Sequence, residues 1–263
     1  MLRKRLVTVL TFNDGVLFRT KLFTPDYRYT LNFVDAWSVD EIVVLDVTRP
    51  GQGNRQNFLD VVKRFARSCF VPIAAGGGVR SLQDVQQLMA VGADKVVVNT
   101  GAIRQPGLIE DIATRHGVQC VVLSIDARRH DEGKYEVFSD FASQPTGKDP
   151  VAWAREGEAR GAGEILVTSV ERDGYLQGYD LTLCRSVADA VRVPVLILGG
   201  AGNWKHMVEG FTDGHASAAC TQNIYHFTEA SIRSAKTYLA GAGIAIRGND
   251  AQSPFAEISR QAV

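Results

Sequence analysis

The chain has 263 residues, of which 45% are hydrophobic, and its 29 Lys and Arg residues balance its 29 Asp and Glu residues. This length and composition suit one large α/β domain, and the zero net charge gives no overall field that would attract nucleic acid or an anionic membrane. No apolar stretch approaches membrane-spanning length, and the N-terminal residues lack the apolar run of a signal peptide. The cysteines have no metal-ligand spacing. We therefore expect a cytoplasmic protein with reduced thiols, and we expect no metal and no cofactor.

Apolar runs alternate with amphipathic stretches along the first half of the chain, which predicts strands and helices in turn. A long loop after the first strand, at residues 11–29, is expected to act as a lid and contains Arg19. A short helix should precede the second strand. The expected strands are Arg5–Leu10, Glu41–Val47, Val71–Ala75 and Lys95–Asn99, and the further helices are Gln56–Cys69, one that starts after Ser81, and Pro106–His116.

The second half repeats this alternation. A second long loop, Ala127–Gly147, is polar and is expected to contain a hairpin at Lys134–Ser139. The expected strands are Gln119–Ile125, Glu164–Ser169 and two more within 193–222, and the helices include Pro150–Arg160, Leu181–Val191 and Thr228–Leu239. Residues 249–263 are polar and lack periodicity, so we expect a single domain at 1–248 followed by a mobile tail.

Two stretches, 71–100 and 193–222, share one pattern of strand, glycine turn, helix and strand. Val71, Pro72, Gly77, Gly78 and Gly92 match, without a gap, Val193, Pro194, Gly199, Gly200 and Gly214. Repeated strand–helix units predict parallel strands, and the internal repeat favours a closed (β/α)8 TIM barrel over a doubly wound sheet. The two half-barrels are expected at about 1–120 and 121–248.

In a TIM barrel the chemistry lies at the carboxyl ends of the strands, and this rule selects the candidate residues. Each glycine turn would let backbone N–H groups approach an anion and is predicted to bind a phosphate, although a tight turn without a ligand is the alternative. Two such sites imply an elongated ligand with a phosphate at each end. The candidates are Gly77, Gly78, Asn99 and Thr100 at the first site, and Asp173, Gly174, Gly199, Gly200, Gln222 and Asn223 at the second.

Asp126 ends the apolar strand 121–126, where burial would raise the pKa of its carboxyl group toward that of a general acid or base. A helix cap or a salt bridge with Arg128 or Arg129 is the alternative. Asp173 is as compatible with a simple turn as with a functional role.

The opposite end of the barrel carries four charges at the starts of apolar strands, namely Arg5, Glu41, Lys95 and Glu164. Barrel geometry could bring them together on the axis. Converging charges are costly unless they pair, so we expect either a paired ring or four unrelated surface charges.

These motifs together resemble the cyclase subunit of imidazole glycerol phosphate synthase, a (β/α)8 enzyme of histidine biosynthesis. The resemblance covers about 1–247 and rests on Leu2–Arg5, Gly76–Arg80, Ala93–Val96, Ser124–Ala127, Gly161–Ser169, Arg172–Gly174, Gly178–Asp180, Gly199–Gly202 and His226–Phe227. It implies a glutaminase partner at the bottom of the barrel and an ammonia gate made of Arg5, Glu41, Lys95 and Glu164. At the top, ammonia would react with a bis-phosphorylated ribonucleotide.

The top of the barrel departs from the family pattern. Of the two catalytic aspartates that the resemblance implies, the second is Asp126 and the first falls on Thr11, whose hydroxyl cannot shuttle protons as a carboxylate does. The lid lysine falls on Arg19. Leu198 and Gln222 are larger than the family's residues, so we expect an anion to occupy the first phosphate site more readily than the second.

We interpret the chain as a divergent paralogue that pairs with a glutaminase and conducts ammonia, with its cyclase activity lost or altered. Similar paralogues deliver ammonia to sugar amidotransferases, so a third protein is a possible partner. The alternatives are an active cyclase in which Thr11 is compensated and a non-catalytic scaffold that activates a glutaminase.

Overall fold

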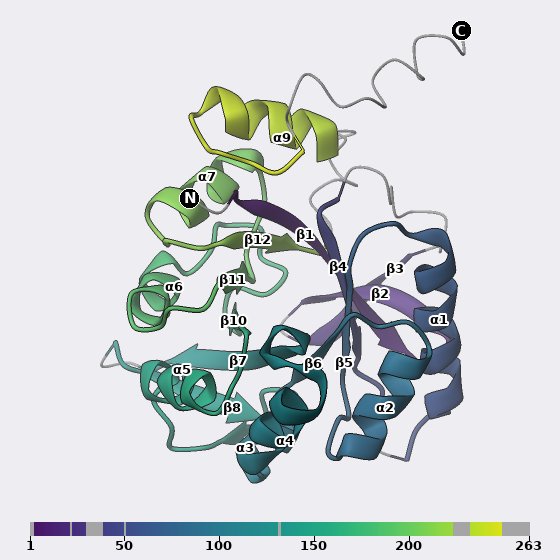
Figure 1. Cartoon of the computed structure of the whole chain (residues 1–263). Helices are drawn as coiled ribbons and strands as arrows, with labels where there is room; N and C mark the ends of the chain where they lie inside the picture. Colours follow the sequence, from purple (N-terminus) through teal and green to yellow (C-terminus); the bar gives the residue numbers. More distant parts are fainter. Residues whose placement is uncertain are drawn as a thin grey trace, which may run out of the picture.

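A computed structural model describes residues 3–21, 23–29, 39–49, 51–130, 133–222 and 232–248. Parallel strands pair in sequence order, and β7 pairs with β10 while β12 pairs with β1, so the sheet closes on itself (Figure 1). The barrel strands are β1 (Arg5–Asn13), β4 (Glu41–Asp46), β5 (Ile73–Gly76), β6 (Lys95–Val98), β7 (Val121–Arg129), β10 (Glu164–Ser169), β11 (Val195–Leu198) and β12 (Ala218–Thr221). The predicted (β/α)8 barrel is confirmed.

Helices surround the barrel between successive strands (Figure 1). They are α1 (Arg55–Ser68), α2 (Leu82–Ala90), α3 (Thr100–Arg104), α4 (Gly107–His116), α5 (Pro150–Ala159), α6 (Leu181–Ala188), α7 (Trp204–Thr212) and α9 (Ile232–Gly241). The helix expected before β4 and the predicted tail at 249–263 lie outside the described residues, as does the start of the predicted last helix.

Polar residues begin several of these helices. Ser81 accepts a hydrogen bond from the backbone N–H of Asp84, and the Asp84 carboxylate accepts one from the N–H of Ser81 in return. Asn54 and Asn203 cap α1 and α7 with side-chain oxygens in the same manner. Each cap satisfies backbone donors that the helix itself leaves unpaired, so these short side chains fix where each helix starts.

Two apolar layers form the core. The outer layer lies between the strands and the helices and contains Leu6, Ile42, Phe58 and Trp153, each at most 1% exposed. The inner layer fills the barrel itself. Because successive strand residues point to opposite faces, each barrel strand contributes to both layers and reads as a nearly continuous apolar run.

The prediction of a long loop at residues 11–29 is wrong. β1 continues to Asn13, and β2 (Val16–Lys21) and β3 (Thr24–Tyr29) form an antiparallel hairpin with it. Asp14 and Gly15 both have positive φ, 41° and 89°, which gives the turn a twist that matches the paired strands. The Asp-Gly pair was the sequence signal for this hairpin.

The second long loop does contain the expected hairpin. β7 extends to Arg129 and pairs with antiparallel β8 (Tyr135–Ser139), which pairs in turn with β9 (Gln144–Pro145). Both hairpins rise from the carboxyl ends of barrel strands, so they stand beside the mouth where the candidate residues lie.

A buried ion pair fastens α9 to the amino end of the barrel. Lys236 Nζ lies 2.6 Å from Asp40 Oδ1, and Asp40 Oδ2 accepts a hydrogen bond from the Leu6 N–H at 2.8 Å. Both charges are less than 10% exposed, so each depends on the other for compensation.

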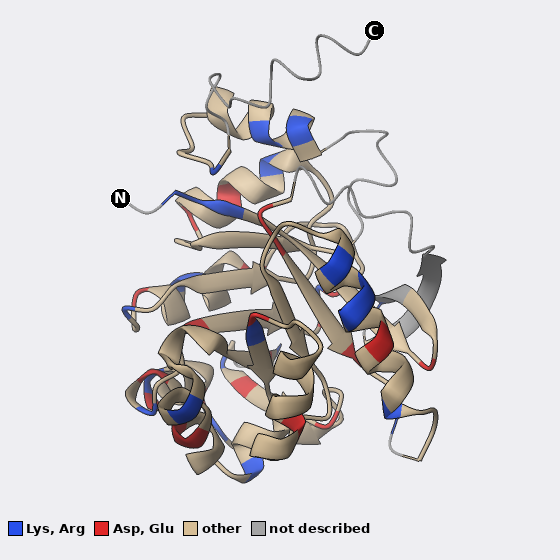
Figure 2. Cartoon of the chain, turned by 45° about the vertical axis from the view of Figure 1, so that its right-hand side comes forward, with Lys and Arg blue, Asp and Glu red and all other residues tan. Residues whose placement is uncertain are grey.

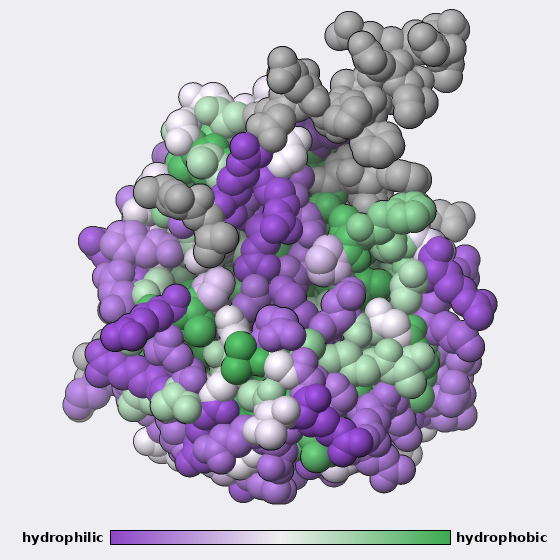
Figure 3. Space-filling view, in the orientation of Figure 1, coloured by the Kyte–Doolittle hydropathy of each residue, from purple (hydrophilic) through white to green (hydrophobic). Residues whose placement is uncertain are grey.

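The remaining charges lie mostly on the outer helices and loops, with both signs interspersed (Figure 2). Apolar residues interrupt the hydrophilic surface on the face seen in Figure 3. Among the described residues, no helix has the length and apolar character needed to cross a bilayer.

Candidate functional site

The four predicted charges at the amino end of the barrel form a closed ring. Arg5 donates to Glu41 Oε2 at 2.6 Å and lies 2.8 Å from Glu164 Oε1. Lys95 Nζ lies 2.9 Å from Glu41 Oε1 and 2.8 Å from Glu164 Oε2. Each cation therefore contacts both anions and each anion contacts both cations, so the sequence alternative of four unrelated charges is excluded.

The exposed fraction of the ring side chains ranges from 2% for Glu41 to 16% for Lys95. Burial alone would lower the pKa of Arg5, but the carboxylates of Glu164 and Glu41 outweigh it and raise that pKa. The ion pairs compensate one another within the ring, which is the condition under which a buried charge cluster is tolerated.

Above the ring, the barrel is filled by apolar side chains. They include Val7, Val43, Val97, Val122, Leu166, Leu196 and Cys220. Burial raises the pKa of the Cys220 thiol well above its usual value, so this residue is neutral as well. Such an interior disfavours any ion, since an unpaired charge in a low-dielectric medium carries a large desolvation cost.

Asp126 lies at the mouth, near the carboxyl end of the barrel. Burial raises its pKa from 3.8 to about 7, and the negative charge of Asp173 adds to the rise, while hydrogen bonds from Asn99 and Ser124 oppose it. Asn99 Nδ2 donates to Asp126 Oδ2 at 2.8 Å. Asn99, predicted only as a phosphate-site residue, therefore also contacts the acid, and a pKa of about 7 suits a group that exchanges protons near neutrality.

Asp126 does not form the alternative salt bridge with a neighbouring arginine. Arg128 lies over the ring of Phe138, 4.9 Å from its centroid. Thr11 is 3% exposed and sits on β1 opposite Leu45 of β4. The position of the first family aspartate therefore contributes no carboxylate to the mouth.

An apolar cluster joins the two hairpins to the loop after β10. Phe23, between β2 and β3, packs with Phe138, Ala142 and Val170. The Phe23 N–H donates to Asp173 Oδ2 at 3.0 Å, so Asp173 ties this hairpin to the loop after β10.

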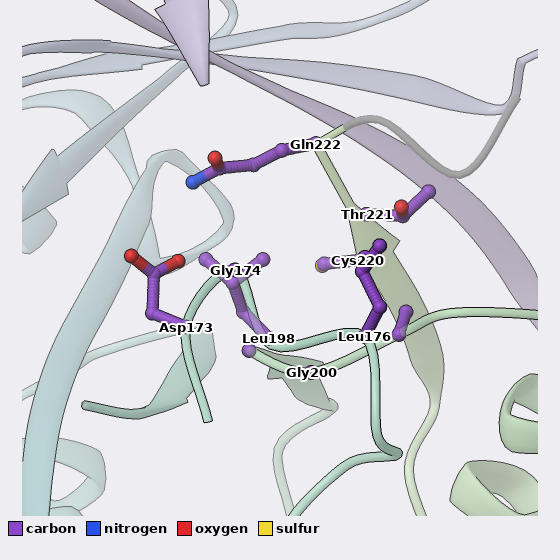
Figure 4. Close-up of a pocket in the computed structure, with 10 residues that line it drawn as sticks. Asp173, Gly174, Leu176, Leu198, Gly200, Cys220, Thr221 and Gln222 are labelled. Carbon is purple, nitrogen blue, oxygen red and sulfur yellow. The ribbon is translucent and has the colours of Figure 1, made fainter. Parts of the chain in front are cut away.

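The second predicted phosphate site is a pocket lined by the loops after β10 and β11 and by the end of β12. Figure 4 shows Gln222 extending across it toward the side that carries Asp173. Gly174, Gly199 and Gly200 line the pocket and have φ values of 76°, 96° and 102°, which only glycine adopts readily. Leu198 and Gln222 line this pocket, and the expectation that an anion occupies the first site more readily than the second stays a prediction.

The first predicted site lies at the exits of β5 and β6. Gly77 and Gly78 have φ values of 94° and 66°, and a side chain at Gly77 would collide with the Asp46 carbonyl. Asn99 precedes α3 and Thr100 begins it. Both glycine turns follow the third strand of their half-barrel with the same left-handed backbone, as the internal repeat predicted.

Sequence reasoning missed several residues at the first site. Arg55, the first residue of α1, donates to the Gly77 carbonyl at 2.9 Å and to Asp46 Oδ2 at 2.8 Å. Arg104 pairs with Asp140, which no sequence signal linked to this site. The structure does not describe the side chains of two predicted residues. Arg19 lies on β2, but its side chain is outside the described part of the structure, and Asn223 is outside it altogether.

The family model described as "Histidine biosynthesis protein" matches residues 8–231. The chain belongs to this family. The match covers most of the barrel and agrees with its closed parallel topology. Within the described residues, no group of three or more His, Cys, Asp or Glu residues is arranged to hold a metal ion.

The raised pKa of Asp126 predicts a pH-dependent stability. The folded state binds this proton more tightly than the unfolded chain, where the pKa is near 3.8. The stabilisation is complete below about pH 4 and is lost as the pH rises toward about 7. Between pH 5 and pH 8, we expect the unfolding free energy of the wild type to fall by roughly 2–3 kcal/mol more than that of Asp126→Asn.

Urea unfolding at both pH values measures this difference, and carboxyl ¹³C NMR reports the pKa directly. Asp213→Asn, at an exposed turn, is the matched control and should keep the wild-type pH dependence. Equal pH dependence in the wild type and Asp126→Asn would contradict the burial account.

Proposed function

We propose that this chain is the ammonia-conducting barrel of a glutamine amidotransferase complex, with the cyclase chemistry that its resemblance implies lost or altered. A glutaminase subunit docks at the amino end, ammonia passes the ring and the barrel interior, and it leaves at the mouth. The observation that carries this proposal is the closed ring of Arg5, Glu41, Lys95 and Glu164 on the barrel axis.

The ring has the properties of a gate for a small neutral molecule. Its charges are mutually paired, so an ion in transit would have to break these pairs. Lys95 contacts both glutamates through a flexible four-carbon stem, and it is the most exposed of the four side chains at 16%. It is therefore the member best able to swing aside and reform its pairs after passage.

The apolar interior supports the same role. Neutral ammonia crosses an apolar medium at far lower cost than ammonium, because desolvation penalises the charged form. Ala74 and Ala218 are the smallest side chains of this inner layer and leave the most room beside the axis. Ammonia released from glutamine would reach the mouth without equilibrating with solvent.

Two exposed apolar residues support docking at the amino end. Phe70 is 77% exposed immediately before β5 begins, and Val118 is 54% exposed just before β7. Both lie on the end of the barrel that carries the ring. Large exposed apolar side chains next to a functional opening are typical of protein interfaces, where aromatic residues contribute most.

The mouth supports altered chemistry. Asp126 retains a pKa suited to proton transfer, but Thr11 supplies no second titratable group. The ammonia acceptor is then either a phosphorylated small molecule held at the mouth or a site on a third protein such as a sugar amidotransferase. Tyr175 and Leu176 are exposed beside the second phosphate site and would contact such a protein.

Two alternatives remain within the same fold. An active cyclase is favoured by the intact Asp126–Asn99 pair and the open pocket at the second phosphate site. A scaffold that only activates a glutaminase would need the exposed face but neither the ring nor the dry interior.

The lack of a carboxylate at position 11, where the chain has Thr11, predicts weak cyclase activity. With ammonia and the bis-phosphorylated ribonucleotide of the family, we expect turnover about 10²–10⁴-fold below that of an enzyme with both carboxylates. Thr11→Asp should raise turnover by at least about tenfold, because it restores the missing proton-transfer group. Thr11→Asn is the matched control and should give no gain. Turnover of the wild type at the level of a complete cyclase would establish the active-cyclase alternative.

If a glutaminase docks at the amino end, the exposed side chain of Phe70 should contribute to the binding affinity. The native chain should co-purify with a glutaminase, and Phe70→Asp should weaken their association by about tenfold or more because a buried aromatic anchor is lost. Tyr175→Asp, at the opposite end, is the matched control and should bind as the wild type does. Sedimentation of the purified pair measures both. Equal affinity of the two variants would place the interface elsewhere.

A further inference from the structure

A left-handed turn stands over the first phosphate site. Asp140, Phe141 and Ala142 follow β8 and have φ values of 51°, 60° and 57°. Three consecutive non-glycine residues in this region are uncommon, because each L side chain crowds its own backbone there. Such a backbone persists only where surrounding contacts hold it, and it is found most often at ligand sites and switch segments.

Polar contacts from the exit of β6 hold this turn. The Asp140 N–H donates to Thr100 Oγ1 at 3.0 Å. Both Asp140 carboxylate oxygens accept hydrogen bonds from Arg104 Nη2, at 2.9 and 2.8 Å. The Ser143 hydroxyl also donates to the Asp140 carbonyl at 2.6 Å. The side chains of Thr100 and Arg104 are therefore both engaged by one residue.

The next residue of the turn reaches the exit of β4. Phe141 lies under the guanidinium group of Arg49, 3.9 Å from the ring centroid. Because β5 lies between β4 and β6 in the barrel, a turn that contacts the loops after β4 and β6 passes in front of the glycine turn that follows β5. Gly77 and Gly78 are in that glycine turn.

The surroundings of the glycine turn favour an anion. Arg55 donates to the Gly77 carbonyl, while Arg49 and Arg104 contact the turn that follows β8, Arg49 at Phe141 and Arg104 at Asp140. The Nη2 atom of Arg55 is buried and has no hydrogen-bond partner in the described part of the chain. Asp140 is the carboxylate that pairs with Arg104. Its side chain is 31% exposed, so an anion can displace it from Arg104.

We propose that Asp140 is a built-in competitor for the anion at the first phosphate site. In the free protein it engages Thr100 and Arg104 and keeps the turn closed over Gly77 and Gly78. A phosphoryl group carries close to two negative charges and three acceptor oxygens, so it displaces the singly charged carboxylate where a simple carboxylate ligand does not.

This inference rests on the phosphate-binding part of the proposed function. Asp140→Asn should increase phosphate affinity at the first site by roughly threefold to tenfold, the range expected for removal of one partly exposed ion pair. Asparagine tolerates the left-handed backbone and keeps the N–H to Thr100, so the fold is preserved.

The measurement is titration with inorganic phosphate, followed through the backbone amide NMR signals of Gly77 and Gly78, with Gly199 and Gly200 as the internal reference. Glu110→Gln removes a carboxylate that pairs with Arg160 on the outer surface, and this matched control should behave as the wild type does. Adding Arg104→Met to Asp140→Asn should cancel the gain, because the freed cation is then absent.

Equal phosphate affinity at Gly77 in the wild type and Asp140→Asn would overturn the competitor role while leaving the phosphate site itself intact. Signals that shift only at Gly199 and Gly200, in every variant, would overturn both the competitor role and the first phosphate site. If the gain in phosphate affinity of Asp140→Asn persists when Arg104→Met is added, the proposal is also overturned, because release of Arg104 is then not the cause of the gain.

Discussion

Four charges withdrawn from water at the amino end of the barrel constrain the rest of the structure. Removing any one of them would leave an uncompensated buried charge, which typically costs about 3–5 kcal/mol. The ring is complete only when β1, β4, β6 and β10 are all in place, because each contributes one member. Closure of the barrel and pairing of these charges therefore depend on each other, and the position of the ring on the axis makes every route through the barrel pass it.

The two ends of the barrel differ in how completely their polar groups are satisfied. At the amino end, every charge of the ring has two partners, and Asp40 meets both Lys236 and a backbone N–H. At the carboxyl end, Asn99 Oδ1 and Arg55 Nη2 are buried without partners among the described residues, and Asp126 has a pKa of about 7. Unsatisfied polar groups are expensive in a folded protein, so their concentration at the mouth supports a ligand there.

The barrel and its charged end could be predicted from the sequence because they rest on repeated local patterns. The apolar runs with glycine turns indicated the strands. The positions of Arg5, Glu41, Lys95 and Glu164 at strand starts indicated either a paired ring or four separate surface charges, and the structure shows the ring. The contacts of the mouth depend on loops that meet from distant parts of the chain. Nothing near Asp140 indicates that it contacts Arg104, and nothing near Phe23 indicates that it bonds Asp173. The hairpin of β2 and β3 replaces the predicted loop, because the length of a stretch does not distinguish a loop from a hairpin, whereas the Asp14-Gly15 turn signal does.

The central claim is that ammonia reaches its acceptor through the barrel, and an isotope competition on the native complex tests it most directly. The purified complex is given glutamine labelled with ¹⁵N in its amide group, together with an excess of unlabelled ammonium in the buffer. If the barrel conducts ammonia, the aminated product carries mainly ¹⁵N in the wild type, and Lys95→Met shifts the product toward the unlabelled nitrogen of the buffer. A wild-type product with the isotope composition of the buffer would contradict the account.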